Sequence, residues 1–192
     1  MQRDFRLLFI SKYNIQGWKI CPGSLIRRHG QIFFFMERIK PSSAAKTVTE
    51  LCATRLPNAY KYSPTDDIQV LCPSRKGEAG TVNLNKYLQA AINPPARGKK
   101  EYKFRDTVFR TCDRVMQIRN NYELEWTRYG KLGLGIFNGD IGKIKDINPA
   151  EKYIEIDFDG REVFYDFADL EDLELAYCVT VHKSQGSEYP TV

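Results

Sequence analysis

The stretch VTVHKSQGSEYP, residues 179–190, is the most informative part of this sequence. The apolar run from Ala176 to Val181 predicts a buried strand, and the polar residues after it predict a short helix or loop. These side chains would lose water without gaining partners if they were buried. We therefore expect the turn at a strand end, where α/β sheets place their ligand sites. Backbone N–H groups there, with Lys183 and the Ser184 hydroxyl, suit phosphate oxygens.

Charge is distributed unevenly along the chain. The 192 residues allow one large domain or two small ones, their apolar content of 42% suffices for a core, and the net charge is +5. Residues 97–119 hold eight basic and three acidic side chains, whereas residues 151–174 hold ten acidic and two basic ones. A polyanion is expected near the first segment and away from the second. For the basic run alone, a solvated surface is an equally good interpretation.

Cysteine spacing and apolar runs exclude several classes of protein. The five cysteines form no CxxC pair and the two histidines are isolated, so we expect no metal site, no disulfide framework and a reducing compartment. Asp4 and Arg6 interrupt the apolar start, which argues against a signal peptide. No apolar run approaches the roughly 20 residues of a membrane span. The expected location is cytoplasmic, without a membrane partner.

The first half of the chain alternates strand and helix patterns. Gln31–Met36 is a continuous apolar run that predicts a strand covered on both faces. A helix is expected from residue 41 until Pro57 ends it, followed by a second strand over 68–71. A second helix is expected over 81–92, stopped by two prolines. Strand, helix, strand, helix predicts a parallel sheet.

After residue 104 the pattern changes to short alternating runs. Ile154, Ile156 and Phe158 alternate with acidic residues, as in a half-buried strand, and Asp159-Gly160 favours a type I′ hairpin turn. The glycine-rich residues 130–135 are expected at a mobile hairpin tip. These features predict a small antiparallel barrel.

Several segments resemble one family of motor proteins. VTVHKSQGSEYP resembles motif V of superfamily 1 helicases, most closely the RecD-like DNA helicases. Residues 70–85, VLCPSRKGEAGTVNLN, resemble the region around motif IV of that family. VMQIRNNYELE (115–125) and FNGDIGKI (137–144) resemble the Src-homology-3-like barrel inserted in its second motor domain. The resemblance implies an α/β fold in which a partial RecA-like parallel-sheet domain is interrupted by that barrel.

The expected domain organisation follows from this order. Residues 1–30 are unassigned, 31–103 form the first part of the RecA-like domain, 104–171 form the barrel, and 172–192 continue the RecA-like domain. Leu173–Val181 is expected to return to the parallel sheet.

The resemblance implies part of an ATP-dependent motor that moves 5′ to 3′ along single-stranded DNA in recombination and repair, as in exodeoxyribonuclease V. Its cofactors would be ATP and Mg²⁺ in the full-length enzyme, with the Mg²⁺ site outside this chain. Residues implied to face DNA are Thr180, His182, Lys183 and Ser184. From their own chemistry, Asn120 and Tyr122 are expected to contact nucleic acid as well, through the amide and by stacking of the ring on a base. Residues implied to face the nucleotide are Arg75, Gln185, Gly186 and Glu188.

Other interpretations of these residues stay open. The asparagines around 120 suit turns, and Arg75 suits an exposed surface. No GxxxxGK[ST] phosphate loop occurs in the sequence, so we expect a fragment that binds single-stranded DNA weakly and hydrolyses no ATP. Its partners would be the first motor domain of the parent protein and other exonuclease subunits. The alternatives are a stand-alone nucleic-acid-binding barrel, and a hydrolase with Ser184 as nucleophile and His182 as base, which helical geometry disfavours.

Overall fold

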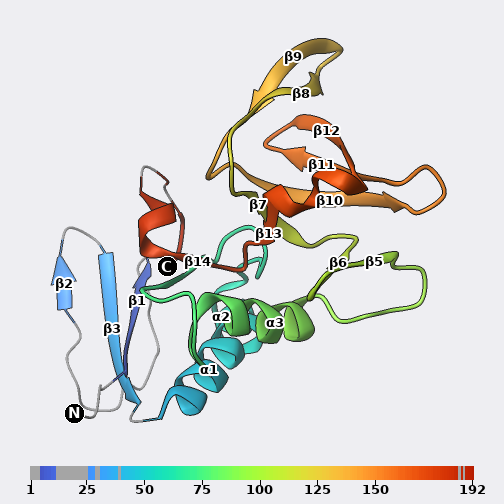
Figure 1. Cartoon of the computed structure of the whole chain (residues 1–192). Helices are drawn as coiled ribbons and strands as arrows, with labels where there is room; N and C mark the ends of the chain where they lie inside the picture. Colours follow the sequence, from blue (N-terminus) through green and yellow to red (C-terminus); the bar gives the residue numbers. More distant parts are fainter. Residues whose placement is uncertain (1–4, 12–25, 29–30, 39, 186, 188) are drawn as a thin grey trace. The chain divides into compact units, whose positions relative to one another are not determined.

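The chain divides into two compact units. The computed structural model describes residues 5–11, 26–28, 31–38, 40–185, 187 and 189–192. One unit comprises Met1–Ile92 with Cys178–Val192, and the other comprises Asn93–Tyr177 (Figure 1). No helix among the described residues is long and apolar enough to cross a membrane.

The first helical segment of the first unit extends further than the sequence predicts, whereas the second spans the expected residues 81–92. The helices of this unit are α1 (Pro41–Glu50), the π-helix η1 (Leu51–Arg55), α2 (Leu56–Tyr60) and α3 (Thr81–Ile92). The expectation that Pro57 ends the first helix is wrong, because Pro57 lies in the first turn of α2, where a proline is tolerated. The π-helix before it shifts the bonding pattern, and the Leu56 N–H donates to the Leu51 carbonyl. Lys61, with a φ of 60°, ends α2 instead.

A parallel strand pair positions the C-terminal segment. β4 (Val70–Cys72) pairs in parallel with β14 (Cys178–Thr180), and Ile68 forms a parallel bridge with Thr191. Within the described residues, this pairing is the extent of the parallel sheet. The Asn85 side chain of α3 holds β14, accepting from the Cys178 N–H at 2.8 Å and donating to its carbonyl at 2.9 Å.

The expected placement of Gln31–Met36 in the parallel sheet is wrong. These residues belong to β3 (Gln31–Arg38), which lies between β1 (Phe5–Ser11) and β2 (Ile26–Arg28) and pairs antiparallel with both. A continuous apolar run predicts burial on two faces but carries no information about the direction of its partners.

The second unit is built around an antiparallel sheet (Figure 1). Its strands are β5 (Glu101–Phe104), β6 (Thr107–Arg110), β7 (Arg114–Gln117), β8 (Asn121–Arg128), β9 (Lys131–Ile136), β10 (Ile141–Asn148), β11 (Tyr153–Phe158), β12 (Arg161–Asp166) and β13 (Leu173–Leu175). Seven of them form one sheet in the order β13-β7-β10-β11-β12-β8-β9, and β5 pairs with β6. Alternate side chains of β11 and β12 are fully buried, which makes the core.

Two hairpins test the turn predictions directly. Asp159 and Gly160 join β11 to β12 with φ of 54° and 81°, so the predicted type I′-like turn is confirmed. The tip of the β8–β9 hairpin is Tyr129-Gly130 alone, with φ of 51° and 74°. The expectation that residues 130–135 form the tip is wrong, because residues 131–136 form β9.

Glycine inside β9 makes room for aromatic rings. The Trp126 ring covers Gly133, where an added methyl group would come within 2.2 Å of it, and Phe137 lies over Gly135. Gly133 therefore serves packing within a strand, and Gly135, with a φ of 93°, also allows a left-handed backbone there. Composition alone does not distinguish such glycines from those of turns.

The second unit starts earlier and ends later than residues 104–171. It begins at Asn93 because the β5–β6 hairpin belongs to it, and it ends at Tyr177. The expected return of Leu173–Val181 to the parallel sheet is wrong for its first half. Leu173–Leu175 form β13, which pairs antiparallel with β7, and pairing with β4 begins only at Cys178.

Candidate nucleic-acid interface

The predicted site residues of the first unit follow two neighbouring strand ends. In the β4–β14 pair, Thr180 lies opposite Cys72. Because the strands are parallel, the segments that follow them leave the sheet at the same edge, which is where α/β sheets bind ligands. One segment is the loop 73–80 with Arg75, and the other is the 3₁₀-helix η3 (Val181–Ser184), which contacts β4.

Hydroxyl groups hold the turn after β14. The Thr180 hydroxyl accepts from the Lys183 N–H at 3.3 Å, and the Ser184 hydroxyl donates to the Val181 carbonyl at 2.8 Å. His182 and Gln185 are exposed, whereas Lys183 is half-buried. Two predicted DNA contacts, Thr180 and Ser184, thus shape the turn that presents the others. Gly186 and Glu188 lie outside the described residues.

The geometry of Ser184 bears on the hydrolase interpretation. Its hydroxyl donates a hydrogen bond to the Val181 carbonyl oxygen, which cannot act as a general base. His182 lies two residues earlier in the same turn and is exposed. A serine nucleophile needs a base that accepts its proton. This arrangement offers no support for such a pair.

The loop after β4 is closed by its own hydrogen bonds. The Thr81 N–H donates to the Ser74 carbonyl at 3.1 Å, and the Cys72 thiol donates to the carbonyls of Ser74 and Ala79 at 3.2 and 3.0 Å. Gly80 is packed so tightly that a methyl group would lie 2.6 Å from the Lys76 carbonyl. The loop leads directly into α3, and Arg75 on it is exposed.

A second group of predicted residues lies on the surface of the other unit. The Asn120 amide donates to the Tyr122 hydroxyl at 3.1 Å and accepts from the Asn138 N–H at 2.9 Å. Tyr122 is 66% exposed and meets Phe137, 42% exposed, edge to face at 5.6 Å between ring centroids. Asn120 therefore holds a tyrosine that presents its ring to solvent. Phe137 was missed from sequence, although an aromatic residue directly before an Asn-Gly turn was a usable signal.

At least four of the eight basic side chains in the run 97–119 have acidic partners. Ion pairs join Lys100 to Asp146 at 2.8 Å, Arg110 to Glu101 at 2.5 Å, and Arg119 to Asp172 at 3.3 Å. Arg105 and Arg119 both contact Glu171, and the hydrogen bond from Arg105, followed by the charge of Arg119, lowers the pKa of that carboxyl. These four side chains therefore do not present a free positive charge, contrary to the expectation of a basic surface. Arg105 and Arg119 meet acids of the later run, whereas Lys100 and Arg110 meet Asp146 and Glu101.

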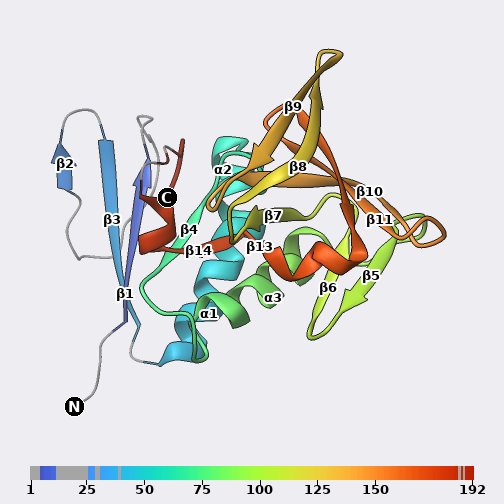
Figure 2. The ribbon, with the colours of Figure 1, turned by 45° about the horizontal axis from the view of Figure 1, so that its top comes forward.

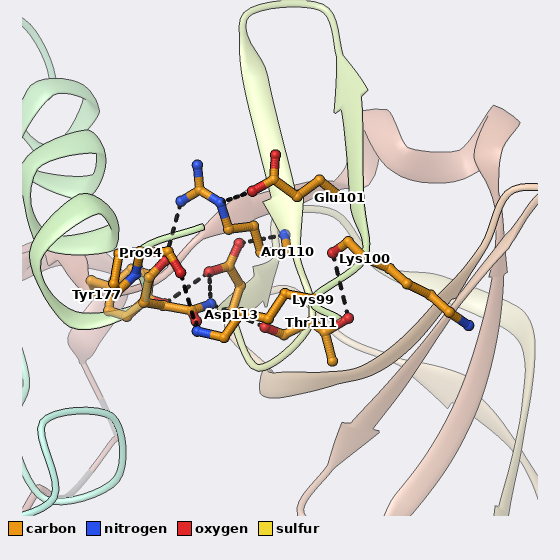
Figure 3. Close-up of polar contacts among 9 residues, drawn as sticks. Pro94, Lys99, Lys100, Glu101, Arg110, Thr111, Asp113 and Tyr177 are labelled. Carbon is orange, nitrogen blue, oxygen red and sulfur yellow. Dashed lines mark hydrogen bonds and ion pairs between the residues drawn. The ribbon is translucent and has the colours of Figure 1, made fainter. Parts of the chain in front are cut away.

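A buried carboxylate links the first and last residues of the second unit. Asp113 is fully buried and accepts from the Asn93 amide at 2.7 Å, the Tyr177 hydroxyl at 2.9 Å and the Arg110 N–H at 2.7 Å (Figure 3). Asn93 and Tyr177 are the first and last residues of this unit. The side chain thus joins the two places at which the chain enters and leaves it. Burial, followed by the charge of Asp113, raises the pKa of Tyr177.

Around this carboxylate, cations hold the residues that begin the unit. Lys99 donates to the Asn93 side chain and to the Pro94 carbonyl, the latter at 3.2 Å (Figure 3). Arg110 donates to the Asn93 carbonyl at 3.2 Å. These two members of the basic run therefore have a structural role.

A comparison with known protein families locates its match mainly in this unit. Residues 84–158 match the family described as the ATP-dependent RecD-like DNA helicase SH3 domain. The chain is 38% identical over 125 residues to the ATP-dependent RecD2 DNA helicase of Deinococcus radiodurans, covering 65% of the chain and 15% of that helicase. It is 29% identical over 143 residues to an uncharacterized protein of Methanocaldococcus jannaschii, covering 66% of the chain and 12% of that protein. The chain thus spans a small part of each of these two relatives. The family match and the similarity to the Deinococcus helicase support the RecD-like resemblance.

Proposed function

We propose that this chain is part of an ATP-dependent 5′–3′ DNA helicase of the RecD-like kind and holds single-stranded DNA through its second motor domain and barrel. The observation that carries the proposal is the parallel pairing of β4 with β14. It brings Arg75 and the turn of His182 and Lys183 to one sheet edge, as a RecA-like domain requires. The family match over residues 84–158 supports the barrel part independently.

The two strand-end segments suit different ligands. On the turn after β14, exposed His182 and half-buried Lys183 would face DNA phosphates. Arg75 and Gln185, both exposed, would face the nucleotide, together with Gly186 and Glu188. ATP, bound with Mg²⁺ held elsewhere in the parent enzyme, would supply the energy for movement. A turn that contacts one ligand beside a loop that contacts the other would couple their binding.

The first experiment tests the DNA contacts proposed for the turn after β14. In the full-length helicase, His182→Ala together with Lys183→Ala is expected to abolish unwinding and DNA-stimulated ATP hydrolysis. The rate of ATP hydrolysis in the absence of DNA is expected to stay unchanged. The control is Lys46→Ala, an exposed lysine on α1. Unwinding at the unaltered rate in the double variant would contradict the motor proposal. The purified chain by itself is expected to hydrolyse no ATP.

A second candidate is a stand-alone nucleic-acid-binding barrel, which the exposed Tyr122–Phe137 pair favours. Stacking of one base on an aromatic ring contributes about 1–3 kcal/mol. If the barrel acts alone, Tyr122→Ala removes the affinity of the chain for an oligothymidine strand, and Lys183→Ala leaves it unchanged. If the motor proposal holds, each variant weakens binding and neither abolishes it.

A further inference from the structure

β9 is an exposed strand at the edge of the sheet. The order of the seven strands ends at β9, so one side of this strand bonds to β8 and the other has no strand beside it among the described residues. Both views show the β8–β9 hairpin extending from the rest of its unit (Figure 1, Figure 2). Its side chains Leu132 and Leu134 are 79% and 63% exposed. An apolar edge strand is a template for pairing with another strand.

Strand register places these leucines on one face with acidic residues. Leu134 lies opposite Glu125, and Leu132 lies opposite Thr127, which in turn lies opposite Glu162. Alternate residues of a strand point to the same side, so the face continues along β12 and β11. The outer face is defined by Leu132, Leu134, Phe164, Glu125, Glu155 and Glu162.

This outer face is the solvent side of the sheet. The residues that alternate with it on β11 and β12, among them Ile156, Val163 and Tyr165, are fully buried in the core. Phe164, by contrast, is 57% exposed. Large apolar side chains on β9 and β12 are thus presented to solvent, with Glu125 and Thr127 of β8 between them. Exposed apolar side chains rimmed by polar residues mark interaction sites.

Charge decides what kind of partner this face suits. In the described part of the chain, Glu125, Glu155 and Glu162 make no ion pair, whereas the neighbouring Asp157 contacts Lys145 at 3.6 Å. Three unneutralised carboxylates beside exposed leucines attract cations and repel nucleic-acid phosphates. A partner must therefore combine apolar side chains with lysine or arginine.

We propose that the β9 edge and the outer face bind an extended basic segment of a protein partner, which adds a strand next to β9. Main-chain hydrogen bonds to the edge of β9 supply affinity, and alternate side chains of the partner segment contact the outer face and supply specificity. Apolar residues of the segment cover Leu132 and Leu134, and its cations lie beside Glu125. This binding goes beyond the proposed DNA-binding function and uses a different surface.

The test uses the whole chain and a peptide of defined composition. The peptide has the six-residue length of β9, with valine at alternate positions and lysine between them. In isothermal titration calorimetry it is expected to bind, and the same peptide with glutamate for lysine is not. Leu134→Ser and Glu125→Lys are each expected to weaken binding about tenfold or more. Val82→Ser, which changes an exposed valine on α3, is the matched control and leaves it unchanged.

Several results would overturn this inference. They are the failure of the lysine peptide to bind, equal binding of the glutamate peptide, and unaltered binding by Leu134→Ser. Displacement of the peptide by an oligothymidine strand would assign the edge to nucleic acid. A dimer in sedimentation equilibrium that Leu134→Ser dissociates would assign it to a second copy. Circular dichroism checks that both variants remain folded, and DNA binding measured in parallel tests the proposed function separately.

Discussion

Removal of the Asp113 carboxylate is expected to destabilise the second unit strongly. Asp113→Ala removes a fully buried acceptor. The Asn93 side-chain amide, the Tyr177 hydroxyl and the backbone N–H of Arg110 then lose their partner. Each hydrogen bond to a charged group contributes about 1.5–3 kcal/mol, and the three are not additive. We expect a loss of about 3–5 kcal/mol in the free energy of unfolding. That is a large share of the roughly 5–15 kcal/mol that stabilises a typical domain.

Urea unfolding of the whole chain measures this loss. A Trp18→Phe background leaves Trp126, which lies in the second unit, as the fluorescent reporter. Asp113→Asn keeps the shape but places an amide group against the Arg110 N–H, and a loss of about 1–3 kcal/mol is expected. Asp106→Ala, at an exposed acid between β5 and β6, is the control and should change stability by less than about 0.5 kcal/mol. Equal stability of Asp113→Ala and the control would refute the role given to this carboxylate.

Three further predictions concern the packing against Gly133, the ionisation of Tyr165 and the hydrogen bonds between Asn85 and β14. Gly133→Ala forces the Trp126 ring off β9, so we expect about 1–3 kcal/mol of destabilisation and a shifted emission maximum. Burial is the main cause that raises the pKa of Tyr165 above its ordinary value of 10.0, and nearby carboxylates raise it further. The folded state therefore resists ionisation of this side chain. Stability from this group is full below pH 10 and is lost as the pH rises further, and tyrosinate absorbance of Tyr165 should appear only with unfolding. Asn85→Ala leaves both backbone groups of Cys178 without partners, and we expect about 2 kcal/mol less stability in the first unit, measured by hydrogen exchange.

Local turn chemistry and strand alternation could be predicted from the sequence. Asp159-Gly160 requires positive φ at both positions, and few residues other than Gly, Asn and Asp tolerate that. Ile154, Ile156 and Phe158 alternate with acids because one face of β11 is buried, as observed. The polar turn after β14 was also predicted, because its composition is incompatible with burial.

Partner choice between distant segments could not be predicted. The pairing of β3 with β1 and β2 depends on residues whose pattern does not encode direction. The neutralisation of Arg119 by Asp172 joins residues from two charge runs that looked separate in sequence. In sequence Asp113 lies within the basic run 97–119 with nothing that marks it as buried, and only folding brings Asn93 and Tyr177 to it.

The central claim is that the turn after β14 contacts a nucleic-acid backbone, and the salt dependence of DNA binding tests it most directly. The affinity of the whole chain for an oligothymidine strand is measured by fluorescence anisotropy over a series of salt concentrations. Loss of one phosphate contact lowers the slope of log K against log salt by about 0.7 for single strands, and we expect that change for Lys183→Ala. Lys46→Ala on α1 should keep the slope of the unaltered chain. Superimposable slopes for Lys183→Ala and the unaltered chain would contradict the account.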